Sequence, residues 1–172
     1  RMMPLRVRSM VGLTPLFAVE IIEPDLLARL PDFKRRLEWL MKYRPELAAL
    51  VAHWIEPGHG NRRLLSLLRP DRMRHVLRRM LDESEFLSPF GVRSLSRAHR
   101  DQPYQTAIDG HPVRVSYQPA ESESGLFGGN SNWRGPVWLP VNYLLVNALY
   151  RFADFYGEAL KVECPTGSGR AC

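Results

Sequence analysis

The fold of this chain is decided by an almost uninterrupted apolar stretch near its C-terminal end, PVNYLLVNALYRFADFY at residues 140–156. Pro140 suits the first turn of a helix and Gly157 suits its end, so the stretch predicts one helix over residues 141–156. The helix is apolar on nearly every side until Arg151. Because such a helix needs neighbours on more than one face, we expect it inside a larger helical assembly.

Two amphipathic helices are predicted in the N-terminal half. The first begins after Asp32, a candidate N-cap, and its apolar residues share one face. These are Phe33, Leu37, Leu40 and Met41. The second begins at Pro45 and ends at the Pro-Gly pair of residues 57–58. Residues 5–22 are largely apolar but lack a deciding period, so a buried strand and a short helix both stay open there.

The most regular helical pattern covers residues 70–82. Apolar residues recur there at i, i+3, i+4, i+7 and i+8, which predicts a surface helix with one buried face. Four arginines occupy its remaining positions: Arg72, Arg74, Arg78 and Arg79. They suggest an alternative function, a basic helical module that binds nucleic-acid phosphates. Acidic residues bracket the cluster, so a solvated helix face is the simpler explanation and a nucleic-acid partner is not expected.

A short β-hairpin is predicted near residues 104–117. The Asp109-Gly110 pair lies between two runs rich in β-branched and aromatic residues, as in hairpins with a type I′ turn. Pro112 places the second strand at an edge of its sheet. Together with the helices, this hairpin makes the expected fold mainly α.

The composition fits one packed domain and excludes several classes of protein. The 172 residues are 45% hydrophobic, and the net charge of +6 describes a mildly cationic chain. Residues 136–150, the longest uncharged stretch in a predicted helix, are shorter than the roughly 20 residues of a membrane span. Two cysteines, Cys164 and Cys172, are too few for a disulfide scaffold, so we expect the cytoplasm. The five scattered histidines lack ligand spacing, and neither a metal nor a cofactor is expected.

A long polar loop precedes the apolar helix. Residues 119–136 are half Gly, Ser and Asn, and long loops in compact domains tend to be functional. Trp133 and Trp138 offer flat apolar faces for a sugar ring. The side chains of Asn130, Asn132 and Arg134 can hydrogen-bond sugar hydroxyls. The loop therefore predicts carbohydrate binding; the alternative is that its Trp and Arg side chains only attach it to a helical core.

Three motifs resemble glycoside hydrolase family 63, in the branch of bacterial glucosidases and mannosylglycerate hydrolases related to mannosyl-oligosaccharide glucosidase. The run GGNSNWRGPVWLPVNYL at residues 128–144 is similar to that family's Trp-Arg-Gly-Pro-x-Trp-x-x-x-Asn-Tyr signature. The run FLSPFGVRSLS at residues 86–96 resembles the Phe-Gly-Leu-Arg-Ser-Leu segment that precedes the signature. The run ECPTGSGR at residues 163–170 resembles the Pro-x-Thr-Gly stretch of bacterial members. The three motifs occur in the expected order.

The resemblance implies a fold and a reaction. Residues 1–172 would be a single partial domain, a segment of the (α/α)6 toroid that forms the catalytic domain, with the hairpin as an addition. The parent enzyme would hydrolyse α-glycosidic bonds in an oligosaccharide or a small glycoside, as a glucosidase or a mannosyl- or glucosylglycerate hydrolase. The reaction would be inverting, with a general acid and a general base about 6.5 to 9.5 Å apart.

The resemblance assigns no catalytic residue within the chain. The general acid is expected upstream of Arg1, since the chain reads as a piece of a longer protein. Glu163 is the single carboxylate in the third motif, but the aromatic residues expected beyond it are missing, so the base stays unassigned. Glu121 and Glu123 match no catalytic motif. We therefore expect the isolated chain to be inactive.

The signature does imply substrate-binding positions. These are Trp133, Arg134, Gly135, Trp138, Asn142 and Tyr143, to which the loop adds Asn130 and Asn132. Asn142 and Tyr143 lie within the predicted helix, so packing in a helical core is an equal alternative for them. A non-catalytic carbohydrate-binding relative is a further alternative for the whole chain. The oligomeric state is not defined by any of these patterns.

Overall fold

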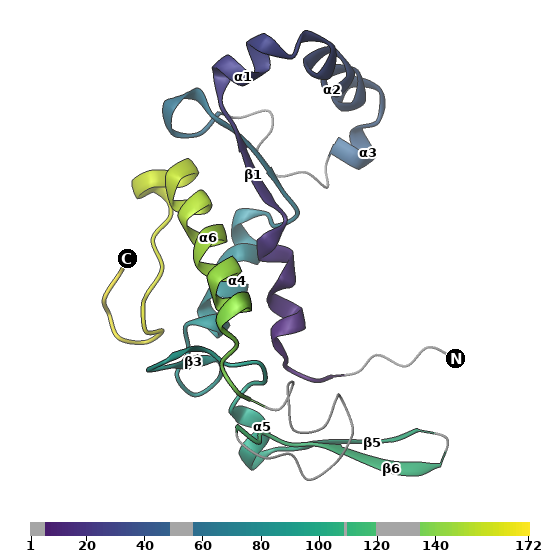
Figure 1. The fold of residues 1–172 in the computed structure, drawn as a ribbon, viewed down its shortest axis with the longest axis vertical. Helices are drawn as coiled ribbons and strands as arrows, with labels where there is room; N and C mark the ends of the chain where they lie inside the picture. Colours follow the sequence, from purple (N-terminus) through teal and green to yellow (C-terminus); the bar gives the residue numbers. More distant parts are fainter. Residues whose placement is uncertain (1–5, 49–56, 109, 120–134) are drawn as a thin grey trace. The chain divides into compact units, whose positions relative to one another are not determined.

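The computed structural model describes residues 6–48, 57–108, 110–119 and 135–172 (Figure 1). The chain divides into two compact units. Unit 1 comprises Arg1–Leu13, Val76–Asn142 and Val162–Cys172, and unit 2 comprises Thr14–His75 and Tyr143–Lys161. About half of the described chain is helical and the strands form small antiparallel pairs, so the mainly α fold with a hairpin is confirmed at this level.

Unit 2 is built on a two-stranded antiparallel sheet. The 3-10 helix η1 (Met10–Phe17) leads into β1 (Val19–Ile22), which pairs with β2 (Arg63–Ser66). Both alternatives left open for the N-terminal stretch are therefore realised, helix first and strand second. Each strand has two buried residues, Val19 and Ile22 in β1 and Leu64 and Ser66 in β2. The buried positions alternate in β2, as on one face of a sheet, but not in β1.

Between the two strands the chain makes a helical excursion. It consists of α1 (Pro24–Arg29), α2 (Pro31–Tyr43) and α3 (Pro45–Ala48), followed after residues 49–56 by the short 3-10 helix η2 (His59–Asn61). Helices α1 and α2 contain no buried residue. Each of the three α-helices begins with proline, which has no N–H to lose in the first turn. The predicted end of the α3 helix, at residues 57–58, follows a stretch outside the described residues.

The prediction that Asp32 caps α2 is wrong. Leu30 occupies the N-cap, and the helix starts at Pro31, whose fixed backbone angle already suits the first helical position. Asp32 instead lies in the first turn, where its carboxylate is 2.7 Å from the guanidinium of Arg35. A carboxylate there still interacts favourably with the positive end of the helix dipole.

The helix predicted from residue 70 is present as α4 (Pro70–Met80). Met73, Leu77 and Met80 are buried, as the apolar period requires. Among its arginines, Arg74 lies 3.7 Å from Asp71 and Arg79 lies 3.3 Å from Glu85. Two of the four arginines thus have carboxylate neighbours; the choice between a solvated helix face and a phosphate-binding surface stays a prediction.

The apolar stretch near the C-terminal end of the sequence forms α6 (Leu139–Tyr156), which continues into the 3-10 helix η4 (Gly157–Ala159). Its buried residues, Leu145, Ala148, Phe152 and Phe155, lie on one face. Tyr143 and Tyr150 on another face are 69% and 72% exposed. The larger helical assembly expected around this helix stays a prediction. The neighbours present cover a single face of the helix.

Unit 1 contains two antiparallel pairs and a short helix. Strands β3 (Leu87–Ser88) and β4 (Gly91–Val92) form a tight turn, and α5 (Ala98–Asp101) follows. The hairpin of β5 (Tyr104–Ile108) and β6 (His111–Val115) confirms the sequence prediction, with Ile108 opposite His111 across the two-residue turn. Gly110 in that turn has φ of 80°, which glycine adopts at little cost.

The C-terminal residues of unit 1 form a bridged loop. Glu163 pairs with Ala171, and the Thr166 backbone N–H donates to the carbonyl of Leu81 at 2.9 Å. The Thr166 hydroxyl donates to the carbonyl of Arg78 at 2.7 Å, which attaches the loop to the end of α4. Burial raises the pKa of the Cys164 thiol in this loop, so the thiol stays protonated at neutral pH.

Two structural absences concern the described part of the chain alone. None of its helices combines the length and the apolar character that crossing a membrane requires. Its His, Cys, Asp and Glu side chains form no group of three or more that would hold a metal ion.

Candidate functional site

The end of the long polar loop is bound to the second sequence motif. Gly135, the first residue described after the loop, donates its backbone N–H to the hydroxyl of Ser94 at 3.0 Å. The Ser94 N–H in turn donates to the carbonyl of Pro136 at 3.0 Å, and Arg93 forms a β-bridge with Val137. Ser94 is fully buried. The residues that follow the loop therefore run as a short strand beside Arg93 and Ser94.

Tyr117, which lies just before the loop begins, also contacts the segment that contains Arg93 and Ser94. Its backbone N–H donates to the carbonyl of His99 at 3.2 Å, and its phenol oxygen accepts a hydrogen bond from Arg93 Nε at 3.2 Å. The Tyr117 ring lies against Gly135, where a Cβ would stand 2.4 Å from a ring carbon. Gly135 also has φ of 136°, so both its backbone and its surroundings require glycine. The two ends of the loop thus meet at the Arg93-Ser94 pair.

Arg93 is a buried residue that donates hydrogen bonds to the segments around the loop base. The residue is 8% exposed, and its Nη1 donates to the carbonyl of Glu83 at 3.3 Å and to the carbonyl of Leu87. A buried guanidinium needs such acceptors, because it cannot lose its proton and its desolvation is costly. Its hydrogen bonds join the β3–β4 turn to the base of the loop.

Asn142 ties the first turn of α6 to the same segment. Its Oδ1 accepts the N–H of Val92 at 2.7 Å, and its Nδ2 donates to the carbonyls of Val92 at 3.0 Å and Trp138 at 2.9 Å. Gly91 makes room for this contact, since a Cβ there would lie 2.8 Å from Asn142 Oδ1. The carboxamide has both donors and its acceptor engaged within the protein. Asn142 thus makes contacts that packing requires, and its role as a substrate-binding position stays a prediction.

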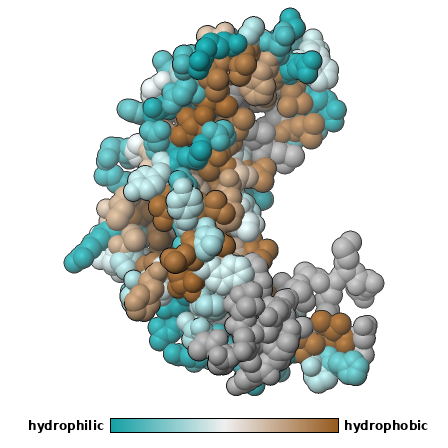
Figure 2. Space-filling view, in the orientation of Figure 1, coloured by the Kyte–Doolittle hydropathy of each residue, from teal (hydrophilic) through white to brown (hydrophobic). Residues whose placement is uncertain are grey.

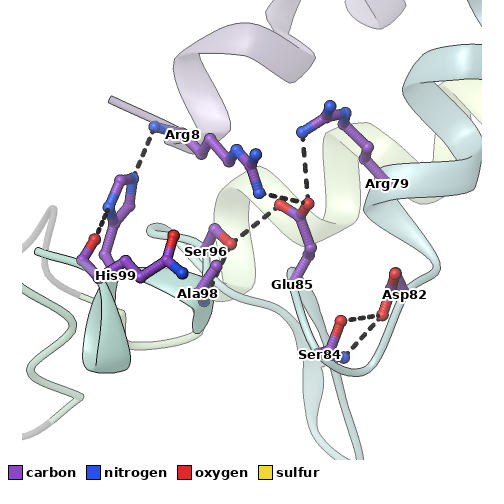
Figure 3. Close-up of polar contacts among 9 residues, drawn as sticks. Arg8, Arg79, Asp82, Ser84, Glu85, Ser96, Ala98 and His99 are labelled. Carbon is purple, nitrogen blue, oxygen red and sulfur yellow. Dashed lines mark hydrogen bonds and ion pairs between the residues drawn. The ribbon is translucent and has the colours of Figure 1, made fainter. Parts of the chain in front are cut away.

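A polar cluster below the loop base attaches the N-terminal segment (Figure 3). Glu85 is at its centre: one carboxylate oxygen accepts from Arg8 at 2.8 Å and Arg79 at 3.3 Å, and the other accepts from the Ser96 hydroxyl at 3.0 Å. The Glu85 side chain is 12% exposed. His99 Nε2 accepts the Arg8 N–H at 2.9 Å while Nδ1 faces the Gln102 carbonyl at 3.1 Å, which assigns the ring proton to Nδ1. The cluster is internally satisfied and acts as a scaffold.

Comparison with known proteins identifies the family to which this scaffold belongs. Residues 63–163 match the mannosylglycerate hydrolase MGH1-like glycoside hydrolase domain. The chain belongs to this family. The match includes the two motifs that meet at the loop base, and it reaches the start of the third. The predicted relationship to family 63 glycoside hydrolases is confirmed.

Two relatives support the assignment. An uncharacterized protein of Saccharomyces cerevisiae is 48% identical over 166 residues, which are 96% of this chain and 15% of that protein. A probable mannosyl-oligosaccharide glucosidase of Schizosaccharomyces pombe is 32% identical over 90 residues, or 51% of this chain and 8% of that protein. The chain thus spans a small part of the length of these relatives. No solved structure matches it.

The predicted substrate positions of this MGH1-like domain fall into three groups. Asn130, Asn132, Trp133 and Arg134 lie outside the described residues. Gly135 and Asn142 are buried or half-buried at the loop base and are engaged within the protein. Trp138 is half-exposed and directly follows Val137 of the Arg93–Val137 bridge, and Tyr143 is exposed on α6.

Of the three carboxylates considered for catalysis, the structure describes one. Glu121 and Glu123 lie outside the described residues. Glu163 is exposed, and its Oε2 accepts the backbone N–H of Gly167 at 2.7 Å, so it closes the turn of the third motif. This contact gives Glu163 a structural role in the MGH1-like domain as described.

Sequence reasoning did not predict that the loop base depends on Arg93, Ser94 and Tyr117. Arg93 and Ser94 lie in the second motif, which served only for the family resemblance, and Tyr117 is the last residue of the predicted hairpin region. The order of the motifs could have indicated this contact. Two segments that occur together in the members of one family are candidates for lying side by side in the fold.

Proposed function

We propose that this chain forms part of the sugar-binding wall of a glycoside hydrolase that cleaves α-glycosidic bonds in an oligosaccharide or a small glycoside. The observation that carries the proposal is the convergence of both ends of the 119–134 loop on Arg93 and Ser94, within a segment that matches a glycoside hydrolase family. Substrate binding requires that the elements carrying the contact residues are held in place, and these hydrogen bonds hold the segments on either side of the loop.

Within this proposal the residues have different tasks. The indoles of Trp133 and Trp138 cover the apolar face of a sugar ring, while Arg134, Asn130 and Asn132 bind its hydroxyls. Gly135 and Asn142 hold the loop and the helix in place. Tyr143 is a further substrate-binding position implied by the signature, and its ring is exposed on α6.

The remaining parts of the proposal concern the complete enzyme. The exposed face of α6, with Tyr143, Val146 and Tyr150 at spacings of three and four, supports a position among further helices, as in an (α/α)6 toroid of which residues 1–172 form one partial domain. The general acid and the general base of an inverting reaction belong to other parts of that enzyme. The chain on its own is then inactive. Its location in the cytoplasm stays a prediction.

The test uses the longer protein that contains this chain. Hydrolysis is followed with α-glucosides, glucosylglycerate and mannosylglycerate, and NMR detects the anomer formed first, which is inverted if the reaction is as proposed. Trp138→Ala should lower kcat/KM by about tenfold or more, equivalent to about 1.4 kcal/mol. Trp39→Ala, which removes a 55% exposed indole from α2, is the matched control and should leave kcat/KM unchanged.

Three results would count against the proposal. Unchanged kcat/KM in the Trp138 variant removes the indole from the pocket. Hydrolysis by the isolated chain contradicts the assignment of the catalytic carboxylates to other parts of the enzyme. Sugar binding by the longer protein without turnover of any of these substrates favours the non-catalytic carbohydrate-binding alternative.

A further inference from the structure

The C-terminal loop of unit 1 brings the two cysteines of the chain together. Glu163 and Ala171 form an antiparallel bridge, and the next pair outward, Val162 and Cys172, exchanges backbone hydrogen bonds of 3.1 and 2.9 Å. Successive side chains of a strand point to opposite faces. Cys164 and Cys172 therefore share the face opposite to Glu163 and Ala171, as diagonal neighbours across the bridge.

The side chains of the two cysteines interact in this arrangement. Burial raises the pKa of the Cys164 thiol most, and the charge of Cys172 and a hydrogen bond with its side chain raise it further. Such a hydrogen bond requires that the two sulfur atoms lie close together, as the register of the bridge indicates. Both thiols are free, with Cys164 half-buried and Cys172 exposed.

The segment between the cysteines has room to adjust. Gly167 and Gly169 have positive φ of 84° and 71°, and a Cβ added at either one would meet nothing within 4 Å. Diagonal neighbours are about 7–8 Å apart, and a disulfide needs Cα atoms within about 6.8 Å, so the loop must close slightly. The loop is the yellow C-terminal segment of Figure 1, and Figure 2 shows hydrophilic and hydrophobic residues side by side in this part of the surface.

We propose that Cys164 and Cys172 form a reversible disulfide by exchange with a small disulfide of the glutathione class. The Cys172 thiolate attacks one sulfur of this oxidant, whose S–S bond breaks, and the released thiolate takes up the proton of Cys172. The sulfur of Cys164 then attacks that of Cys172 and displaces the second small thiolate, which takes up the proton of Cys164. Two protein thiols are oxidised, and one small disulfide is reduced to two thiols.

Exposure and charge decide the order of these steps. Cys172 reacts first because it is exposed, whereas Cys164 is half-buried. Once Cys172 is part of a mixed disulfide it carries no charge, so the rise in the pKa of Cys164 that this charge causes is removed. The second step is therefore favoured by the first.

The disulfide would hold the loop on the end of α4. Thr166, between the two cysteines, donates its N–H to the carbonyl of Leu81 at 2.9 Å and its hydroxyl to the carbonyl of Arg78 at 2.7 Å. A cross-link beside these contacts opposes their opening. The pair is independent of the proposed glycosidase function, because its chemistry uses thiols alone.

The test treats the longer protein that contains this chain with mixtures of reduced and oxidised glutathione at neutral pH. Free thiols are then trapped by acid and alkylation, and the protein is digested with trypsin. Cleavage after Lys161 and Arg170 places Cys164 and Cys172 in different peptides. Mass spectrometry should find the two peptides joined, with two hydrogen atoms fewer than their sum, and dithiothreitol should separate them. Glutathione attached to Cys172 without joined peptides, or no reaction, would overturn the proposal.

A matched variant tests the register of the bridge. The double variant Cys172→Ser, Ala171→Cys keeps both the number of thiols and the loop length, but moves one thiol to the opposite face. Its peptides should become joined at least about tenfold more slowly, since the effective concentration of one thiol near the other falls. Both positions are exposed, so folding should be preserved. Equal rates would show that any two thiols of a flexible loop react, and would overturn the proposal.

Discussion

The carboxamide of Asn142 pairs with both backbone groups of Val92, accepting its N–H at 2.7 Å and donating to its carbonyl at 3.0 Å. The side chain thereby takes the place of a neighbouring strand beside β4. This one residue connects the motif at 128–144 with the motif at 86–96, through a contact between residues 50 positions apart in the sequence. The family signature therefore contains a structural bond as well as candidate sugar contacts.

Replacement of Asn142 by alanine should destabilise the chain by about 1–3 kcal/mol, because the Val92 N–H and carbonyl lose their partner in a half-buried place. Asn147→Ala is the control on the same helix: its Nδ2 donates to the Tyr143 carbonyl from an exposed position, and its loss should cost at most about 0.5 kcal/mol. Urea unfolding measures both. Equal losses of stability would show that the Val92 contact contributes nothing specific.

Gly135→Ala should be much more damaging than Gly110→Ala. Both residues have positive φ, but an added Cβ meets nothing within 4 Å at Gly110 and lies 2.4 Å from the Tyr117 ring at Gly135. Backbone strain alone should cost about 1 kcal/mol at Gly110, and displacement of the ring should add about 1–3 kcal/mol at Gly135. Thermal unfolding and near-ultraviolet circular dichroism of tyrosine measure the difference. Similar melting temperatures for the two variants would contradict the packing of Tyr117 on Gly135.

Glu85→Gln should lower the free energy of unfolding by about 1–3 kcal/mol, because Glu85 is 12% exposed and accepts from two arginines and a serine. Glu20→Gln removes an exposed carboxylate that pairs with Arg151 at 2.6 Å, and should cost less than about 1 kcal/mol. Urea unfolding in low and high salt distinguishes the stability losses of the two variants. The cost at Glu20 should fall with salt while the cost at Glu85 persists; salt-sensitive stability at Glu85 would argue against the buried cluster.

Tyr156 should give the chain an alkaline dependence of stability. Burial raises the pKa of Tyr156 from 10.0 to about 12 in the folded protein. Folding then favours the protonated phenol, so this contribution is complete below pH 10 and is lost as the pH rises from 10 towards 12. Absorbance at the phenolate band should show one tyrosine ionising last, and Tyr156→Phe should remove that component. Unchanged titration curves in the variant would refute the assignment.

Particular elements show what a sequence pattern can predict. The period of Met73, Leu77 and Met80 identified α4, because one buried face produces a repeat along the chain. The Asp-Gly turn identified the β5–β6 hairpin for an equally local reason, its backbone geometry. The N-cap of α2 was misplaced by two residues, since the start of a helix depends on which of several adjacent residues leaves the helical conformation. The face of α6 that is buried within this chain could not be predicted from its sequence, because the helix is apolar on nearly every side and burial depends on which neighbours are present.

The amino-acid sequence determined the family of this protein, the mainly helical character of its fold and the motif around Trp133 and Arg134 as a candidate sugar contact. These follow from local patterns and from residues in a recognisable order. The tertiary structure decided that Arg93 and Ser94 join the ends of the loop and that the side chain of Asn142 is hydrogen-bonded to Val92. The physical reason is that such hydrogen bonds form between residues distant in sequence, whose proximity is produced by folding and has no period along the chain.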